Sequence, residues 1–234
     1  STIASMIATY SAVILSDMVG VNYSSICRGM AMELSRGLDN GDGNGTAADG
    51  QLHVDEIDSS TLICSAVGMI KDIDSGSGSS YPDQFTAVGS TLYFRATDGT
   101  NGYELWKSDG TATGTVMVKD IISGSSSGYP SSLTVLGNTL YFTASDGTNG
   151  SELWKSDGTP SGTVMVKNIR SGSSSSYPEL ITLVGNTLYF RADNGINGRE
   201  LWKSDGTASG TALVKDINSG SGEGYPSLLT AVGN

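Results

Sequence analysis

One feature constrains the fold more than any other: the octapeptide ELWKSDGT occurs three times without a change. The copies lie at 104–111, 152–159 and 200–207, so the chain repeats with a period of 48 residues. A fixed period of this length is typical of stacked supersecondary units, such as solenoids, propellers and arrays. Such regularity favours a surface or filament protein over an enzyme.

One period of the repeat predicts four short antiparallel strands joined by turns. In the second copy the predicted strands are 133–136, 139–145, 151–155 and 163–169. They are rich in β-branched and aromatic residues. The segments between them hold Gly, Asn and Asp, which tolerate positive φ. We therefore predict an all-β fold of four-stranded repeats in a β-propeller-like array.

The array has incomplete ends. Residues 67–73 match the fourth strand of a repeat, and residues 230–234 match the end of a first strand. Closed propellers need at least four blades, so three whole repeats would leave strand edges that template pairing with another chain. We expect either a longer protein or edges completed by neighbouring subunits, which would make a filament or ring.

The repeat has a counterpart among known families. The run ELWKSDGTATGTVMVKDI at 104–121 resembles the ELWxxDGT repeat of large bacterial and archaeal surface proteins. The resemblance covers about residues 66–234. It implies a propeller-like β fold and a cell-surface or extracellular location, and it implies no defined enzymatic activity.

Two repeated side chains have both a structural and a ligand-binding interpretation. The tryptophans Trp106, Trp154 and Trp202 occupy one repeat position, and they either pack one repeat on the next or stack against carbohydrate. We expect them in the repeat core. The aspartate of each Asp-Gly-Thr either closes a turn or binds a cation, and the turn is the expected role.

An acidic, glycine-rich segment precedes the repeats. Residues 39–58 carry six carboxylates and no Lys or Arg. Calcium takes six to eight oxygen ligands, which such loops supply. We therefore predict a Ca²⁺ site here, with a solvated acidic loop as the alternative. The expected ligands are Asp39, Asp42, Asn44, Asp49 and Glu56.

Two cysteines, Cys27 and Cys64, flank this segment. An even, minimal count favours one disulfide between them, with two free thiols as the alternative. The bracketed segment resembles the short, calcium-loop-like modules of microbial surface proteins. The chain then divides into an N-terminal arm at 1–26, a disulfide-closed acidic module at 27–65 and the repeat array at 66–234.

The N-terminal arm opens with 16 residues that carry no charge. Its apolar residues fit a helix, a two-part strand or the remnant of a signal peptide. As a helix or a strand, the arm could reach a neighbouring subunit. An uncharged extended arm beside open strand edges suits donor-strand addition, in which one subunit completes the sheet of the next.

Composition excludes several classes of function. The net charge of −11 argues against nucleic-acid binding, and the chain has no apolar span long enough for a membrane helix. It has one histidine, His53, and no catalytic constellation, so we do not expect an enzyme. Three sequons make Asn22, Asn44 and Asn149 candidate glycosylation sites.

These features lead to one hypothesis and one alternative. The hypothesis is an extracellular structural protein, a subunit that assembles with itself into a filament or surface layer through open β-edges and the arm. The alternative is a carbohydrate-binding adhesin, a β-propeller fragment of a longer surface protein whose partners are glycans.

Overall fold

Short strands and tight turns alternate in the order that the 48-residue period predicts. The computed structural model describes residues 68–232, and within them it contains twelve strands and no helix. The strands of the first repeat are β1 (Asp83–Val88), β2 (Thr91–Thr97), β3 (Tyr103–Ser108) and β4 (Val116–Lys119). Those of the second are β5 (Ser131–Leu136), β6 (Thr139–Ser145), β7 (Ser151–Ser156) and β8 (Val164–Lys167). Those of the third are β9 (Glu179–Val184), β10 (Thr187–Asp193), β11 (Arg199–Ser204) and β12 (Ala212–Lys215).

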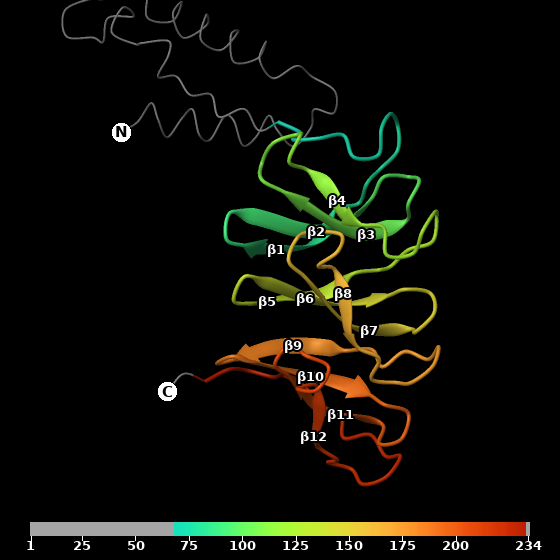
Figure 1. The fold of residues 1–234 in the computed structure, drawn as a ribbon, viewed down its shortest axis with the longest axis vertical. Helices are drawn as coiled ribbons and strands as arrows, with labels where there is room; N and C mark the ends of the chain where they lie inside the picture. The colour runs from blue at the N-terminus through green and yellow to red at the C-terminus, as the bar shows by residue number, and fades with distance from the viewer. Residues whose placement is uncertain (1–67, 233–234) are drawn as a thin grey trace, which may run out of the picture. The chain divides into compact units, whose positions relative to one another are not determined.

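Each repeat forms one four-stranded antiparallel sheet of consecutive strands (Figure 1). The register is the same in all three sheets. The phenylalanine of the second strand lies opposite the tryptophan of the third in the pairs Phe94–Trp106, Phe142–Trp154 and Phe190–Trp202. The prediction of an all-β fold made of four-stranded repeats is therefore confirmed.

The first strand of every sheet contains a β-bulge. Its register against the second strand shifts between Asp83 and Thr86 in β1, and at the same place in β5 and β9. Inside each bulge one residue other than glycine has a positive φ: Gln84 at 58°, Ser132 at 54° and Leu180 at 56°. The extra residue bends the strand and increases its twist.

The hydrophobic core lies between successive sheets, because both faces of a sheet are apolar. Between the first two repeats it contains Tyr93, Leu105 and Val118 from the first, and Leu140, Phe142, Ala144 and Trp154 from the second. The equivalent residues of the second and third repeats form the next cluster. Each sheet thus directs Phe, Ala and Trp to the preceding repeat and Tyr, Leu and Val to the following one.

The two ends of the array depart from the sequence expectation. Residues 68–73 and 230–232 contain no strand, so the prediction of partial strands there is wrong for these residues. The fourth strand of a repeat forms by pairing with the third strand of the same repeat, as β4 pairs with β3. Residues 68–73 have no such third strand to pair with among the described residues. Lys71 still donates to the Thr115 carbonyl at 2.8 Å. The arm and the acidic module predicted at 1–65 lie outside the described residues.

Candidate functional site

Successive repeats meet through the same hydrogen bonds at both interfaces. In each case a lysine ammonium group donates to a backbone carbonyl of the following repeat. The donor and acceptor pairs are Lys107–Gly158 (2.8 Å), Lys155–Gly206 (3.0 Å), Lys119–Thr163 (2.8 Å) and Lys167–Thr211 (2.7 Å). Donors lie on one side and acceptors on the other, so the interface is heterologous, and each added repeat can form the same contact with the next.

The apolar part of the interface depends on a close approach between a tyrosine and a glycine. The hydroxyl of Tyr93 lies so near Gly158 that a Cβ there would collide with it, and Tyr141 approaches Gly206 in the same way. Both glycines also have a positive φ, of 88° and 89°, which disfavours any other residue. The Asp-Gly-Thr turn therefore receives the ring of the preceding repeat.

In the third repeat, the sheet face that packs on the following repeat in the first two repeats is not covered by a further repeat among the described residues. Val214 is 41% exposed, whereas the equivalent Val118 and Val166 are 2% and 7% exposed. Val184 and Ile217 are exposed as well, and Tyr189 is only half-buried. We call Val184, Tyr189, Val214 and Ile217 the open face.

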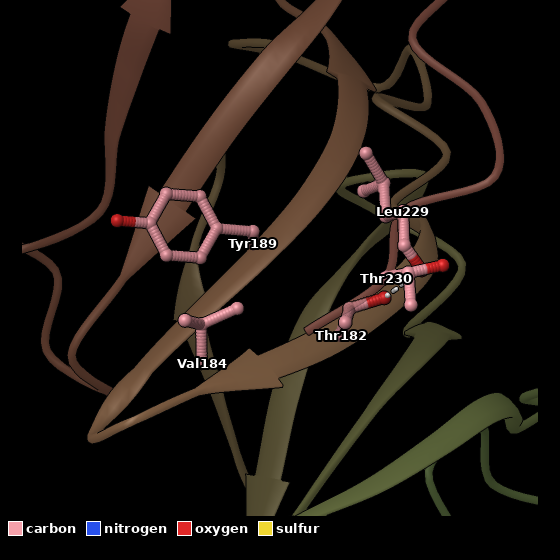
Figure 2. A pocket seen from close by; sticks show the side chains of 5 residues that line it. All are labelled: Thr182, Val184, Tyr189, Leu229 and Thr230. Carbon is pink, nitrogen blue, oxygen red and sulfur yellow. Dashed lines mark hydrogen bonds between the residues drawn. The ribbon is translucent and has the colours of Figure 1, made fainter. Parts of the chain in front are cut away.

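A shallow hollow of about 200 Å³ lies beside the open face. Figure 2 shows its lining: Thr182, Val184, Tyr189, Leu229 and Thr230. The Thr182 hydroxyl donates to the Leu229 carbonyl at 3.4 Å, as Thr134 donates to Ile181 at 3.1 Å between the second and third repeats. The segment at 229–230 therefore begins to cover the surface that a further first strand would cover.

The first repeat exposes a complementary surface. Leu92 and Phe85 are exposed, whereas Leu140 and Leu188, which are equivalent to Leu92, are completely buried by the repeat before them. The exposure is limited to these positions, because Phe94, Ala96 and Trp106 of the same sheet are buried and Ile73 packs against them. We call Phe85 and Leu92 the receiving face. The open face and the receiving face are the two halves of an interface that the chain contains twice in intact form.

A fully buried glutamate begins the ELW run of every repeat. Glu104 accepts hydrogen bonds from the backbone N–H groups of Ile121 (3.0 Å) and Gly128 (2.6 Å). Glu152 accepts them from Ile169 (2.9 Å) and Ser176 (3.0 Å) in the same positions. The carboxyl group thus anchors the long connector that follows the fourth strand.

Burial governs the acidity of these glutamates. It raises the pKa of Glu104 to about 7 against the opposing effect of the two N–H donors, and nearby Asp120 adds to the rise. Burial also raises the pKa of Glu152, although the Ser176 hydroxyl donates to it at 2.6 Å. Sequence reasoning missed this role, although the presence of Glu in every ELW copy was a usable signal.

The repeated tryptophans and aspartates have structural surroundings. Trp106, Trp154 and Trp202 are all buried, so no indole face is open to a ligand. In each Asp-Gly-Thr turn the aspartate accepts from the backbone and the side chain of the threonine, at 2.9 Å and 2.7 Å for Asp109 and Thr111. These hydrogen bonds lower the pKa of Asp109.

Most of the predicted site residues lie outside the described part of the chain. This applies to the calcium ligands Asp39, Asp42, Asn44, Asp49 and Glu56, to Cys27 and Cys64, and to the sequon at Asn22. Asn149 is described and half-buried, and its amide nitrogen donates to Asp146 at 2.7 Å. A glycan on this nitrogen would replace one of its two amide hydrogens beside Asp146, while the backbone N–H groups of Thr148 and Asn149 still hold the turn.

A further repeated feature, which the sequence interpretation above did not use, is a set of exposed tyrosines that each precede a proline. They are Tyr81 (65% exposed), Tyr129 (58%), Tyr177 (50%) and Tyr225 (54%). All four have a positive φ, between 44° and 49°. We call these four residues the tyrosine row.

Two further findings concern residues 68–232 only. No three His, Cys, Asp or Glu side chains in this part of the chain come together as a metal-binding group. The same residues contain no helix with the length and apolar character that crossing a membrane requires.

Comparison with known proteins adds little to this account. No family model and no curated protein matches the chain. Among solved structures the chain is similar to the crystal structure of the computationally designed Ika8 protein, with 16% sequence identity and a TM-score of 0.34. The match covers 59% of this chain and 37% of that one, and a likeness this low carries no argument. The class rests on the repeats themselves: residues 68–232 form an all-β repeat fold.

Proposed function

We propose that the chain is an extracellular structural protein, a subunit that assembles with copies of itself into a filament or surface layer. One observation carries this proposal: the exposure of Val214, at a position that is buried in both preceding repeats. Contiguous exposed apolar surface marks interaction sites in soluble proteins. The intact interfaces indicate that the surface of a further repeat fits it, and we propose that the receiving face of a second copy supplies that surface.

The chemistry of the joint follows from the interfaces within the chain. Burying apolar side chains contributes roughly 25 cal/mol per Å², and the Tyr, Leu and Val positions of the open face supply this surface. Lys203 and Lys215 occupy the positions from which lysines of the earlier repeats donate to the following repeat. A heterologous contact of this kind generates an open filament unless its rotation closes a ring.

The proposed contact between two copies of the chain uses a sheet face as well as the strand edges that the sequence indicated. The support for a face is that the side chains which lose cover at the end of the array point out of the sheet, as Val118 and Val166 do in the core clusters. We propose that the arm at 1–26 adds to this joint as a donor strand. Loss of assembly after deletion of 1–16 supports that role, and unchanged assembly contradicts it.

Substitution of Val214 by lysine tests the proposal. A charge placed in a surface that must become dry is expected to weaken self-association at least about tenfold, measured by sedimentation velocity over a range of concentrations. Electron microscopy of the unsubstituted protein is expected to show fibres or sheets.

Val164→Lys is the matched control. Val164 lies on β8, in the fourth strand of its sheet like Val214, and it is 38% exposed although a repeat already covers that sheet. Lysine there is expected to leave assembly unchanged. The proposal is contradicted if the unsubstituted protein stays monomeric at high concentration, or if Val214→Lys and Val164→Lys weaken self-association equally.

We also propose that the repeats wind in a β-propeller-like manner. The support is that the first strands of successive sheets are neighbours, with β5 in contact with both β1 and β9, as in blades arranged around an axis. Helical reconstruction of the fibres would measure the rotation from one repeat to the next. A rotation near zero would contradict propeller-like winding.

The acidic module supports a further proposal on sequence grounds. We propose that residues 39–56 bind Ca²⁺ and that Cys27 and Cys64 form a disulfide, as suits an extracellular protein. Mass spectrometry of the purified protein tests both points. Absence of bound calcium at millimolar Ca²⁺, or two alkylatable thiols without reductant, would contradict them.

A further inference from the structure

The tyrosine row places one exposed aromatic ring on each successive repeat. The four residues occupy one repeat position, immediately before a proline and the bulged first strand or its equivalent. Because the repeats share one fold and one interface, the rings recur at the same place along the array. At least half of each tyrosine remains accessible to solvent.

The backbone at these positions is strained for a tyrosine. A positive φ costs a residue other than glycine on the order of 1–2 kcal/mol, and Asn tolerates it better than Tyr. The backbone N–H of Tyr129 donates to the Tyr103 carbonyl at 3.1 Å, a bond that any residue except proline could make. Neither the turn nor its hydrogen bond requires an aromatic ring.

Packing within the protein does not explain the ring either. Tyr129 stacks on Tyr103, with ring centres 5.9 Å apart and planes 20° from parallel. The residues equivalent to Tyr103 are Ser151 in the second repeat and Arg199 in the third. Tyrosine therefore occupies this repeat position whether the neighbouring side chain is aromatic, small or charged.

Two of the four rings have a neighbour that covers one face. Tyr103 covers one face of Tyr129, and Arg191 lies 6.0 Å from the centre of the Tyr225 ring. Arg191 is itself fixed by an ion pair with Glu179 at 2.5 Å. A ring that is fixed on one face and open on the other is a preorganised stacking platform.

We propose that the tyrosine row binds a neutral polysaccharide, with one sugar ring stacked on each tyrosine. A tyrosine offers an apolar face to the C–H groups of a pyranose and a hydroxyl to its polar edge. The inference concerns this surface alone and does not depend on self-assembly.

The charges around the row favour a neutral ligand. Arg191 is paired with Glu179, and Arg95, which lies 5.7 Å from the Tyr103 ring, is paired with Asp83. These two guanidinium groups are therefore paired before any ligand arrives. Arg199 and Glu223 also act on Tyr225 with opposite charges, and the chain as a whole is acidic. A polyanion would be repelled by the acidic chain, whereas a hydroxyl-rich polymer meets paired hydrogen-bonding groups near Tyr129 and Tyr225.

Substitution of tyrosine by asparagine separates binding from stability. Tyr129→Asn removes the ring and also relieves the backbone, so the variant is expected to be at least as stable as the original. Affinity electrophoresis in gels containing hydroxyethyl cellulose measures binding. Each such substitution at 129, 177 or 225 is expected to weaken retardation about five- to tenfold, and the triple variant is expected to lose it.

Three controls make the outcome decisive. Tyr129→Phe keeps the ring and is expected to keep most of the binding. Ile196→Asn removes another highly exposed apolar side chain, from the turn between β10 and β11, and is expected to change nothing. Dextran sulfate and a decaproline peptide serve as a polyanion and an extended peptide. Absence of retardation by the neutral polymer, retardation that survives the triple substitution, or tighter binding of either alternative probe overturns the inference.

Discussion

A buried carboxyl group recurs at one residue position in every repeat, and it explains how a long Ser/Gly connector is held. Glu104 accepts N–H groups from residues 121 and 128, at the two ends of the connector. Charged residues are rarely fully buried, so composition favours an exposed glutamate, and only its recurrence in every ELW copy pointed to a structural role. Its local environment depends on the connector folding back over β3, which a single sequence does not reveal.

The raised pKa of Glu104 predicts that stability changes between about pH 4.5 and 7. In this interval the folded protein binds more protons than the unfolded chain, so the free energy of unfolding falls as the pH rises. Glu152 acts in the same direction. We expect the melting temperature to increase when the pH is lowered from 7.5 to 5, measured by calorimetry.

Below this interval the trend reverses. Hydrogen bonds from Thr111 lower the pKa of Asp109 below its ordinary value of 3.8, and Asp157 behaves alike. Their contribution is lost as the pH falls through the lowered values, so stability is expected to be greatest near pH 4–5. Glu104→Gln is expected to flatten the dependence above pH 4.5. A melting temperature that rises steadily from pH 5 to 7.5 would contradict the account.

At the scale of elements, the strands were predictable where periodicity alone decides. The strand predicted at 139–145 is β6, with the same bounds. The strand predicted at 163–169 ends earlier, at Lys167, because the Ile169 N–H donates to Glu152 and leaves the ladder. The strand predicted to start at 133 is β5, which begins two residues earlier, at Ser131. The prediction missed these residues because the bulge at Ser132 contains no glycine that would indicate it.

The bulge on β9 leads to a prediction of its own. Leu180 has a φ of 56° and is exposed, so its side chain gains little from packing. Leu180→Gly is expected to stabilise the protein by about 0.5–1 kcal/mol, because glycine adopts this φ without strain. Urea titration followed by circular dichroism measures the change.

Leu183→Gly, on the same strand, is the control. Leu183 packs against the core cluster between the second and third repeats, so its loss is expected to destabilise the protein by about 2–5 kcal/mol. Destabilisation by both substitutions would show that the bulge depends on the leucine side chain.

At the scale of the whole molecule, the repeat predicted the stacking of units but not which surfaces they share. A run such as Leu140-Tyr141-Phe142 is apolar on both faces, which fits a sheet between two others. That the tyrosine meets a glycine of the next repeat, while the phenylalanine meets the preceding one, depends on tertiary contacts. The open and receiving faces could therefore be recognised only by comparing equivalent positions in the structure.

The measurement that tests the central claim most directly is a mixing experiment with two variants. Val214→Lys blocks the open face, and Leu92→Lys blocks the receiving face. Each variant alone is expected to sediment as a monomer, with a circular dichroism spectrum like that of the unsubstituted protein. An equimolar mixture is expected to form dimers and nothing larger, because one intact open face meets one intact receiving face. If the mixture stays monomeric, or if either variant alone still forms long assemblies, head-to-tail stacking of the repeats is not how this chain assembles.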